Sequence, residues 1–107
     1  MAPAPQLDLL LLARLTAGPM HGYGLVVSLR EVSGGELEYP EGTVYPALHR
    51  LEADGLVVST SARIDGRVRR VYRLTPKGRK AAADRVSSWR RYVNAVEALL
   101  AAPAEAT

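Results

Sequence analysis

The sequence contains no cysteine and no phenylalanine, and Trp89 is its single tryptophan. Without thiols the chain forms neither a disulfide nor a thiolate metal site, and a reducing cytoplasm suits it. Without phenylalanine, a hydrophobic core has to be built from leucine, valine and alanine. Apolar residues make up 48% of the chain, which is enough for a globular fold.

Long apolar runs are also missing. The longest, Leu9 to Ala13, is far shorter than the roughly 20 residues that a transmembrane helix needs. Met1 to Pro5 lacks the charged flank and the apolar region of a signal peptide. We therefore expect a cytoplasmic protein without a membrane partner, with short disordered segments at residues 1–5 and 102–107.

Lysine is scarce, with two residues against twelve arginines, and the basic residues are unevenly distributed. Residues 63–91 hold eleven basic and two acidic side chains, a local excess of +9, although the whole chain carries only +3. Residues 1–62 hold three basic and seven acidic side chains, an excess of −4. This polarity indicates a polyanionic partner, although a solvated, arginine-rich face also explains it.

A chain of 107 residues allows one domain with a modest core. Apolar residues at i, i+3, i+4 and i+7 predict three helices, at residues 6–17, 21–33 and about 40–55. The residues that the second helix is expected to bury are Leu25, Val26, Leu29 and Val32. Gly34-Gly35 then suits a left-handed C-terminal cap. Pro46 has to lie in the first turn of the third helix or kink it, because a mid-helix proline costs about 3 kcal/mol.

Residues 56–63 and 68–74 predict two strands joined by the tight-turn signal Ile64-Asp65-Gly66. Strand alternation points one set of side chains toward the core, namely Val68, Tyr72 and Leu74. The opposite face is expected to carry Arg67, Arg69, Val71 and Arg73.

Thr75 and Pro76 predict the N-cap and the first residue of a fourth helix of about 25 residues. Its apolar residues recur at alternating steps of four and three, which is the heptad pattern of a packed seam. A small domain is too short to cover the whole seam, so the pattern predicts a homodimer. The expected interface residues are Val86, Trp89, Val93, Val96 and Leu100.

The predicted order is three helices, a hairpin and a long helix. We therefore expect a mainly α protein with a small β-hairpin: a winged helix-turn-helix domain at residues 6–75 and a dimerisation helix at residues 76–101. The outward side of the third helix suits the major groove of duplex DNA, and the hairpin arginines suit phosphate. The expected DNA-binding residues are Thr43, Tyr45, His49 and Arg50 of the helix and Arg63, Arg67, Arg69 and Arg70 of the hairpin.

Several of these assignments have alternatives. Thr43 also suits an N-cap that makes no DNA contact. The hairpin arginines also protect an exposed strand edge from aggregation, and strand alternation turns Arg70 toward the domain. Packing alone also explains Trp89 in an apolar seam.

Three segments of the chain are distinctive: His21-Gly-Tyr-Gly-Leu25, residues 41–56 and Tyr72-Arg-Leu-Thr-Pro-Lys-Gly78. Together they resemble the PadR family of bacterial transcriptional repressors, in its branch with a single C-terminal helix, over about Leu7 to Leu100. The resemblance implies a dimer held by the last helix and bound to a pseudo-palindromic operator. It further implies, for some members, a small aromatic ligand at the dimer interface, stacked on a tryptophan that matches Trp89. Glu41-Gly42 departs from the family pattern, in which proline often precedes this glycine.

Two other classes of function stay open. One is a winged-helix module that contacts an acidic protein partner through its hairpin and does not bind DNA. An enzyme has the weakest support, because no acid–base pair, nucleophile or metal-ligand set has a suitable spacing. His21 suits a helix cap better than a catalytic role. We therefore expect no catalytic residue, no metal and no cofactor.

Overall fold

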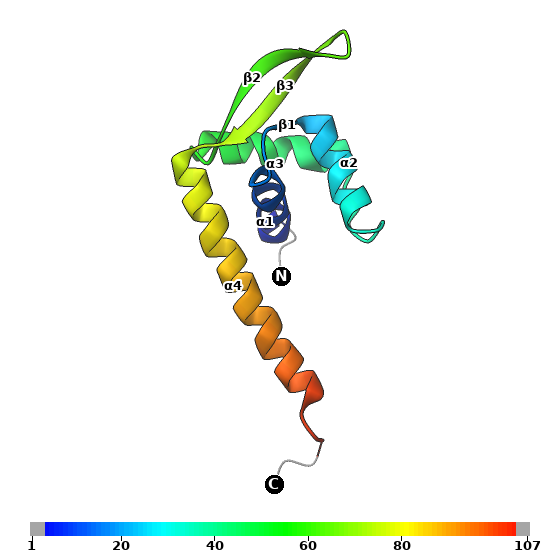
Figure 1. Ribbon diagram of the computed structural model, residues 1–107, viewed down its shortest axis with the longest axis vertical. Coiled ribbons are helices and arrows are strands. Elements are labelled where there is room, and N and C mark those ends of the chain that lie inside the picture. Colours follow the sequence, from blue (N-terminus) through cyan, green and yellow to red (C-terminus); the bar gives the residue numbers. More distant parts are fainter. Residues whose placement is uncertain (1–3, 105–107) are drawn as a thin grey trace.

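The helices and the hairpin predicted from the sequence are present in the computed structural model, which describes residues 4–104. The helical part consists of α1 (Ala4–Leu15), α2 (Gly22–Val32) and α3 (Glu41–Ala53). The hairpin consists of β2 (Val57–Ile64) and β3 (Arg67–Leu74), and it is followed by α4 (Pro76–Ala101). The winged helix-turn-helix arrangement with one long last helix is thus confirmed (Figure 1).

The ends of α1 differ slightly from the prediction. The helix begins at Ala4, inside the segment expected to be disordered, and it ends at Leu15. Gly18, with a φ of 143°, follows in a conformation that favours glycine. Residues 102–104 have no regular secondary structure, and the rest of the two segments predicted to be disordered, 1–3 and 105–107, lies outside the described part.

Helix α2 begins with the predicted cap. His21 Nδ1 accepts a hydrogen bond from the Gly24 backbone N–H at 3.0 Å, which satisfies one of the free donors of the first turn. Leu25 and Leu29 are buried as predicted. Val32 was predicted to be buried but is 66% exposed, because it lies in the last turn, past the part of the helix that contacts the core.

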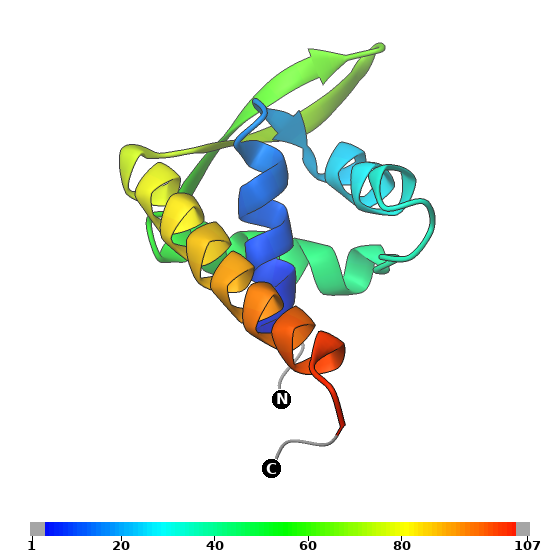
Figure 2. The same ribbon diagram turned by 60° about the horizontal axis from the view of Figure 1, so that its bottom comes forward.

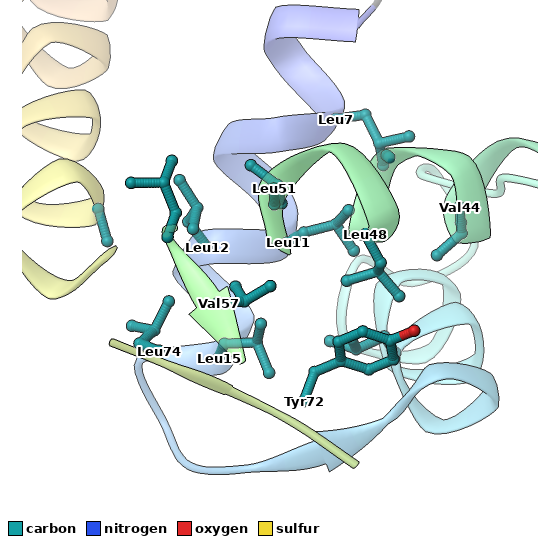
Figure 3. Close-up of a cluster of buried hydrophobic side chains, with 14 of the residues drawn as sticks. Leu7, Leu11, Leu12, Leu15, Val44, Leu48, Leu51, Val57, Tyr72 and Leu74 are labelled. Carbon is teal, nitrogen blue, oxygen red and sulfur yellow. The ribbon is translucent and has the colours of Figure 1, made fainter. Parts of the chain in front are cut away.

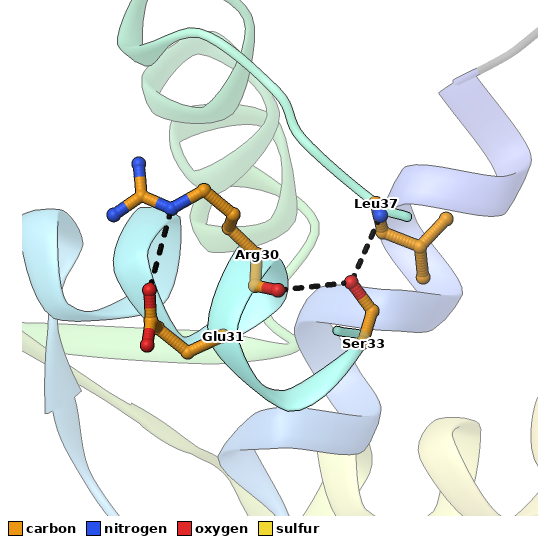
Figure 4. A network of polar contacts seen from close by, with 4 residues as sticks. All are labelled: Arg30, Glu31, Ser33 and Leu37. Atoms are coloured by element: carbon orange, nitrogen blue, oxygen red, sulfur yellow. Dashed lines mark hydrogen bonds and ion pairs between the residues drawn. The ribbon is translucent and has the colours of Figure 1, made fainter. Parts of the chain in front are cut away.

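The end of α2 is closed by backbone and side-chain hydrogen bonds. Gly34 and Gly35 have φ values of 67° and 88°, and the Gly35 N–H donates to the Arg30 carbonyl oxygen at 2.8 Å. Ser33 Oγ donates to the same carbonyl at 3.2 Å and accepts from the Leu37 N–H at 2.8 Å (Figure 4). These bonds turn the chain toward α3.

Helix α3 contains its proline just past the first turn, whereas the prediction allowed the first turn or a kink. Pro46 is the sixth residue of the helix, so the Gly42 carbonyl four residues earlier has no intrahelical donor. Both residues are exposed, where water can satisfy that carbonyl. Gly55, with a φ of 77°, then leads the chain from α3 into the hairpin.

The hairpin strands pair antiparallel over their whole length, with Ile64 opposite Arg67 at the turn. Asp65 and Gly66 alone connect the strands, with φ values of 51° and 78°, the left-handed pair of a type I′ turn. A two-residue strand, β1 (Met20–His21), pairs with β3 and completes a sheet in the order β1-β3-β2. This third strand was not predicted from the sequence.

The hydrophobic core lies between α1, α2, α3 and the inner face of the sheet (Figure 3). Its fully buried side chains are Leu11, Leu12, Leu25, Val44, Leu48, Leu51, Val57 and Tyr72. The prediction for Tyr72 and Leu74 is confirmed. Val68 was predicted to point into the core but is 68% exposed, because it pairs with Arg63 near the turn, where the hairpin projects past the helices.

Helix α4 is anchored most tightly at its start. Thr75 Oγ1 accepts from the Gly78 N–H at 3.0 Å, as predicted for an N-cap, and donates to the Gly55 carbonyl oxygen at 2.6 Å. Gly78 and Ala82 are buried against the domain. Beyond them α4 runs away from the hairpin and gives the molecule a length of 64 Å (Figures 1 and 2).

Candidate nucleic-acid interface

The residues predicted to share the outward side of α3 point in different directions. Successive helical residues are rotated by about 100°, so Thr43 and Tyr45 lie about 160° apart around the axis. Thr43 is exposed on the flank that leads toward α1, and His49 is exposed on the side opposite the buried Val44 and Leu48. Among the predicted residues, His49 is therefore the one that points most directly away from the core.

Arg50 faces α1, so the prediction that it shares the outward side of α3 is wrong. Its Nη2 lies 2.7 Å from Asp8 Oδ1, and Asp8 Oδ2 lies 3.8 Å from Arg85 Nη1 of α4. The Asp8 side chain is mostly buried, whereas both arginines are more exposed. One carboxylate thus connects α1, α3 and α4.

Tyr45 lies on the flank of α3 that faces the hairpin, and it is half-buried rather than fully exposed. Its ring packs on Gly22 at the start of α2, where a Cβ would overlap it. Burial raises the pKa of the Tyr45 hydroxyl, Glu41 raises it further, and Arg69 opposes the shift. The hydroxyl therefore stays protonated near neutral pH and is able to donate a hydrogen bond.

The hairpin presents arginines on both faces. Arg67 and Arg69 share the outer face, as strand alternation predicts. The Arg69 guanidinium carbon lies 5.8 Å from the centroid of the Tyr23 ring, which is the geometry of a cation–π contact. Arg63 Nη1 donates to the Gly66 carbonyl oxygen at 2.9 Å, so this side chain helps to hold the turn.

Arg70 lies on the inner face, which is the alternative that strand alternation had left open. Its Nη1 donates to Ser59 Oγ at 3.0 Å, and Ser59 Oγ donates to the Glu52 carboxylate at 2.9 Å. Glu52 also accepts from the Ser59 backbone N–H at 3.1 Å. Glu52 and Ser59 were not predicted from the sequence, because their contact depends on how the hairpin folds back on α3.

The predicted seam of α4 is partly covered by its own chain. The half-buried seam residues are Val86, Val93 and Val96. The large apolar side chains that stay exposed on α4 are Trp89, Tyr92, Leu99 and Leu100. The rings of Trp89 and Tyr92 are 5.7 Å apart, and Trp89 is 43% exposed. The single chain therefore leaves apolar surface uncovered along the second half of this helix.

A groove of about 620 Å³ lies between Thr16, just after α1, and the part of α4 from Arg79 to Asn94. Its lining combines the apolar Leu74, Ala82 and Val86 with the basic Arg79 and Arg90. Trp89 does not line this groove, although it shares the predicted seam of α4 with Val86, which does. The groove and the predicted ligand-stacking tryptophan are thus separate features of the single chain.

Within residues 4–104, no cluster of histidine, aspartate and glutamate side chains is arranged to hold a metal ion. No helix in this described part combines the length and the apolar character needed to cross a membrane.

Comparison with known proteins identifies related regulators. Residues 11–84, more than half of the chain, match the family described as "Transcriptional regulator PadR-like family". The transcriptional regulator Rv3488 of Mycobacterium tuberculosis is 53% identical over 62 residues, which cover 58% of this chain and 55% of that protein. The chain thus spans about half the length of this curated relative.

Solved structures share the fold. A PadR family transcriptional regulator from Eggerthella lenta has a TM-score of 0.77 at 30% identity, with coverage of 92% of this chain and 84% of that chain. Bacillus subtilis PadR in complex with operator DNA has a TM-score of 0.67 at 25% identity, with coverage of 74% of this chain and 46% of that chain. The Mycobacterium tuberculosis and Eggerthella lenta proteins are described as transcriptional regulators. The chain belongs to the PadR-like family of transcriptional regulators.

Proposed function

We propose that this protein is a cytoplasmic transcriptional repressor that binds a pseudo-palindromic DNA operator as a homodimer. One observation carries the proposal: the start of α3 and the arginine-bearing strand β3 meet at one pocket, so the helix and the hairpin serve the same surface. The solved complex of Bacillus subtilis PadR with operator DNA supports it, because that relative has the same fold. Repression is the mode that the family resemblance implies.

The contacts of each side chain divide the proposed DNA-binding residues into three groups. His49 and Thr43 are exposed on α3 and are proposed to face the major groove, with Tyr45 at its edge. Arg63, Arg67 and Arg69 are proposed to meet phosphate or the minor groove. Arg50 is held by Asp8 and Arg70 by Ser59, so their proposed role is to position α3 and the hairpin; Arg70 keeps further N–H donors that can also meet phosphate.

The hairpin part of the proposal is tested by removing Arg67 and Arg69 together, as alanine substitutions. Binding to all duplex sequences should weaken, and the slope of log affinity against log salt should fall by about 1 for each phosphate that the protein no longer neutralises. The matched control replaces Arg79 and Lys80 of α4 with alanine, which removes the same charge outside the hairpin. An equal weakening of binding in both double variants would reject a specific role of the hairpin.

A gel-shift assay against random duplex DNA at low salt separates this function from a protein-contact module. The proposal predicts a shifted complex at micromolar protein, because nonspecific affinity rests on phosphate contacts. No binding under these conditions would favour a module whose basic hairpin meets an acidic protein.

The ligand part of the proposal places a small aromatic molecule beside Trp89 at the dimer interface. Such a ligand can release the operator only if it binds one dimer geometry better than the other. As the single tryptophan of the chain, Trp89 reports binding through its fluorescence. We expect altered emission with at least one member of a broad aromatic panel, and unaltered emission throughout would argue against a stacking site.

A further inference from the structure

A pocket of about 210 Å³ lies where the start of α2, the start of α3 and strand β3 meet. That volume is several times the ~30 Å³ that one water molecule occupies in the liquid. Two arginines and three other polar side chains take part in its lining: His21, Tyr23, Tyr45, Arg69 and Arg70. Neither the family match nor the predicted site assigns a role to His21 or Tyr23.

The two uncharged groups on the helix side are available as hydrogen-bond donors. His21 Nδ1 accepts from the Gly24 N–H, and a neutral imidazole that accepts at one nitrogen carries its proton on the other. Its Nε2 is therefore an N–H donor. The Tyr45 hydroxyl provides a second donor, because its raised pKa keeps it protonated near neutral pH.

The two arginines are fixed by contacts that leave most of their donors free. The Arg69 guanidinium carbon lies over the Tyr23 ring, 5.8 Å from its centroid, and this contact gives no hydrogen-bond acceptor oxygen to its five N–H donors. Arg70 uses Nη1 to bond Ser59 Oγ, whereas a guanidinium has five N–H donors. Among the described residues, neither arginine has a carboxylate oxygen within the 4.0 Å of an ion pair. Within the described part of the chain the two arginines therefore have no direct ion pair, although Glu52 is linked to Arg70 through Ser59 and Glu41 acts on the nearby Tyr45 hydroxyl.

We propose that this pocket binds one backbone phosphate of the bound duplex, with Arg69 and Arg70 as charged donors and His21 and Tyr45 as uncharged ones. The inference rests on the proposed DNA binding and adds a specific phosphate-binding site to it. A phosphodiester is an anion whose free oxygens only accept hydrogen bonds, which matches a lining dominated by donors. A base edge presents donors as well as acceptors in the major groove and fits this lining less well.

A phosphate bound in this pocket would contact three elements of the fold. His21 caps the start of α2, Tyr45 belongs to α3 and the arginines belong to β3, so a single bound group fixes the hairpin relative to α3. Phosphate contacts of this kind set the register of a protein on the duplex without reading its sequence.

The test combines a charge-removing variant with chemical modification of individual phosphates in a duplex selected by the protein. Arg69→Gln should weaken binding to selected and random duplexes alike and lower the salt slope by about 1. In the wild type, ethylation of one phosphate in each half-site should block binding, and Arg69→Gln should lose that sensitivity. Arg73→Gln is the matched control, because Arg73 lies on the same face of β3 but does not line the pocket.

A second variant distinguishes the loss of a specific phosphate site from a general loss of positive charge. Tyr23→Leu keeps every charge but removes the ring under the Arg69 guanidinium, so it should weaken the same phosphate sensitivity in part. If Arg69→Gln left the salt slope and the ethylation pattern unchanged, the proposed phosphate site would be wrong, but the proposal of DNA binding would stand. Absence of duplex binding in the wild type would overturn the proposed function itself.

Free inorganic phosphate distinguishes the source of the phosphate group. At constant ionic strength, micromolar inorganic phosphate should leave duplex binding unchanged, because the proposed occupant is a phosphate fixed in the DNA backbone. Saturable inhibition at those concentrations would assign the pocket to a free anion and overturn its assignment to DNA.

Discussion

Gly78 is a residue at which α4 packs directly against the backbone of the winged-helix fold. A Cβ at this position would overlap the Leu56 carbonyl oxygen, and backbone cannot move aside as a flexible side chain can. We predict that Gly78→Ala destabilises the folded protein by about 1–3 kcal/mol, the usual cost of overpacking. Urea unfolding followed by circular dichroism measures this change.

Gly42 provides the control for that substitution. It is also a helical glycine, but a Cβ there would meet nothing within 4 Å. Gly42→Ala should therefore leave stability unchanged or raise it by up to about 1 kcal/mol, because alanine restricts the unfolded chain. Equal destabilisation by both substitutions would show that the contact with Leu56 is not the cause.

Tyr72 gives the stability of the protein a dependence on alkaline pH. Burial raises the pKa of its hydroxyl, and the Glu52 carboxylate raises it further. Because the folded pKa lies above the unfolded value of about 10, the stabilisation is complete below that pH and is lost as the pH rises through the folded pKa. Unfolding free energies measured above pH 10 should therefore fall less steeply in Tyr72→Phe than in the wild type.

Among the secondary-structure elements, those with strong local signals were predicted best. Asp65-Gly66 forms the expected tight turn, which is of type I′, Thr75 caps α4 and Gly34-Gly35 closes α2. Each of these features depends on the φ angle or the side-chain oxygen of one or two residues, so the sequence contains the whole signal. The shared outer face of Arg67 and Arg69 follows from strand alternation in the same way.

Features that depend on packing between elements were not predictable in this way. Strand β1 has two residues, too few to show an alternating pattern, and it exists because β3 offers it a partner. The pairing of Arg50 with Asp8 joins residues 42 positions apart, so the sequence could not distinguish it from an outward-facing arginine. Val68 has the correct alternation, but burial also requires a helix beneath it.

The contact of Asp8 with α3 and α4 makes a testable link between helices. Replacing the carboxylate with an amide in Asp8→Asn removes two ion pairs, so we predict a loss of about 1 kcal/mol in the free energy of unfolding. Asp84→Asn is the control, because Asp84 pairs with Lys80 on the exposed surface of a single helix. This substitution should lower the free energy of unfolding by only about 0.2–0.5 kcal/mol, the usual contribution of an i,i+4 ion pair. Equal losses of unfolding free energy in the two variants would show that the ion pairs of Asp8 do not stabilise the packing of these helices.

The whole molecule separates its proposed DNA-binding surface from its proposed dimer surface. The hairpin lies at one end of the 64 Å long molecule, and the C-terminal part of α4 lies at the other (Figure 1). Apolar side chains remain exposed on that part of α4, although the core itself is closed. A second copy that covers them would place two hairpins and two α3 helices in a two-fold arrangement.

Leu100 tests this arrangement without disturbing the core of one chain, because its side chain is 75% exposed. Leu100→Asp should convert the proposed dimer into a monomer in sedimentation at concentrations where the wild type is dimeric. Ala98→Asp introduces the same charge about 160° around the helix and should leave the dimer intact. Dissociation by both variants, or by neither, would place the interface elsewhere.

Selection of bound duplexes from a random pool tests the central claim most directly, because it reports specificity, symmetry and spacing in one measurement. A homodimer that reads DNA through α3 and the hairpin should enrich sequences with two inverted half-sites separated by about one helical turn. Enrichment of a single asymmetric motif, or no enrichment at all, would contradict it.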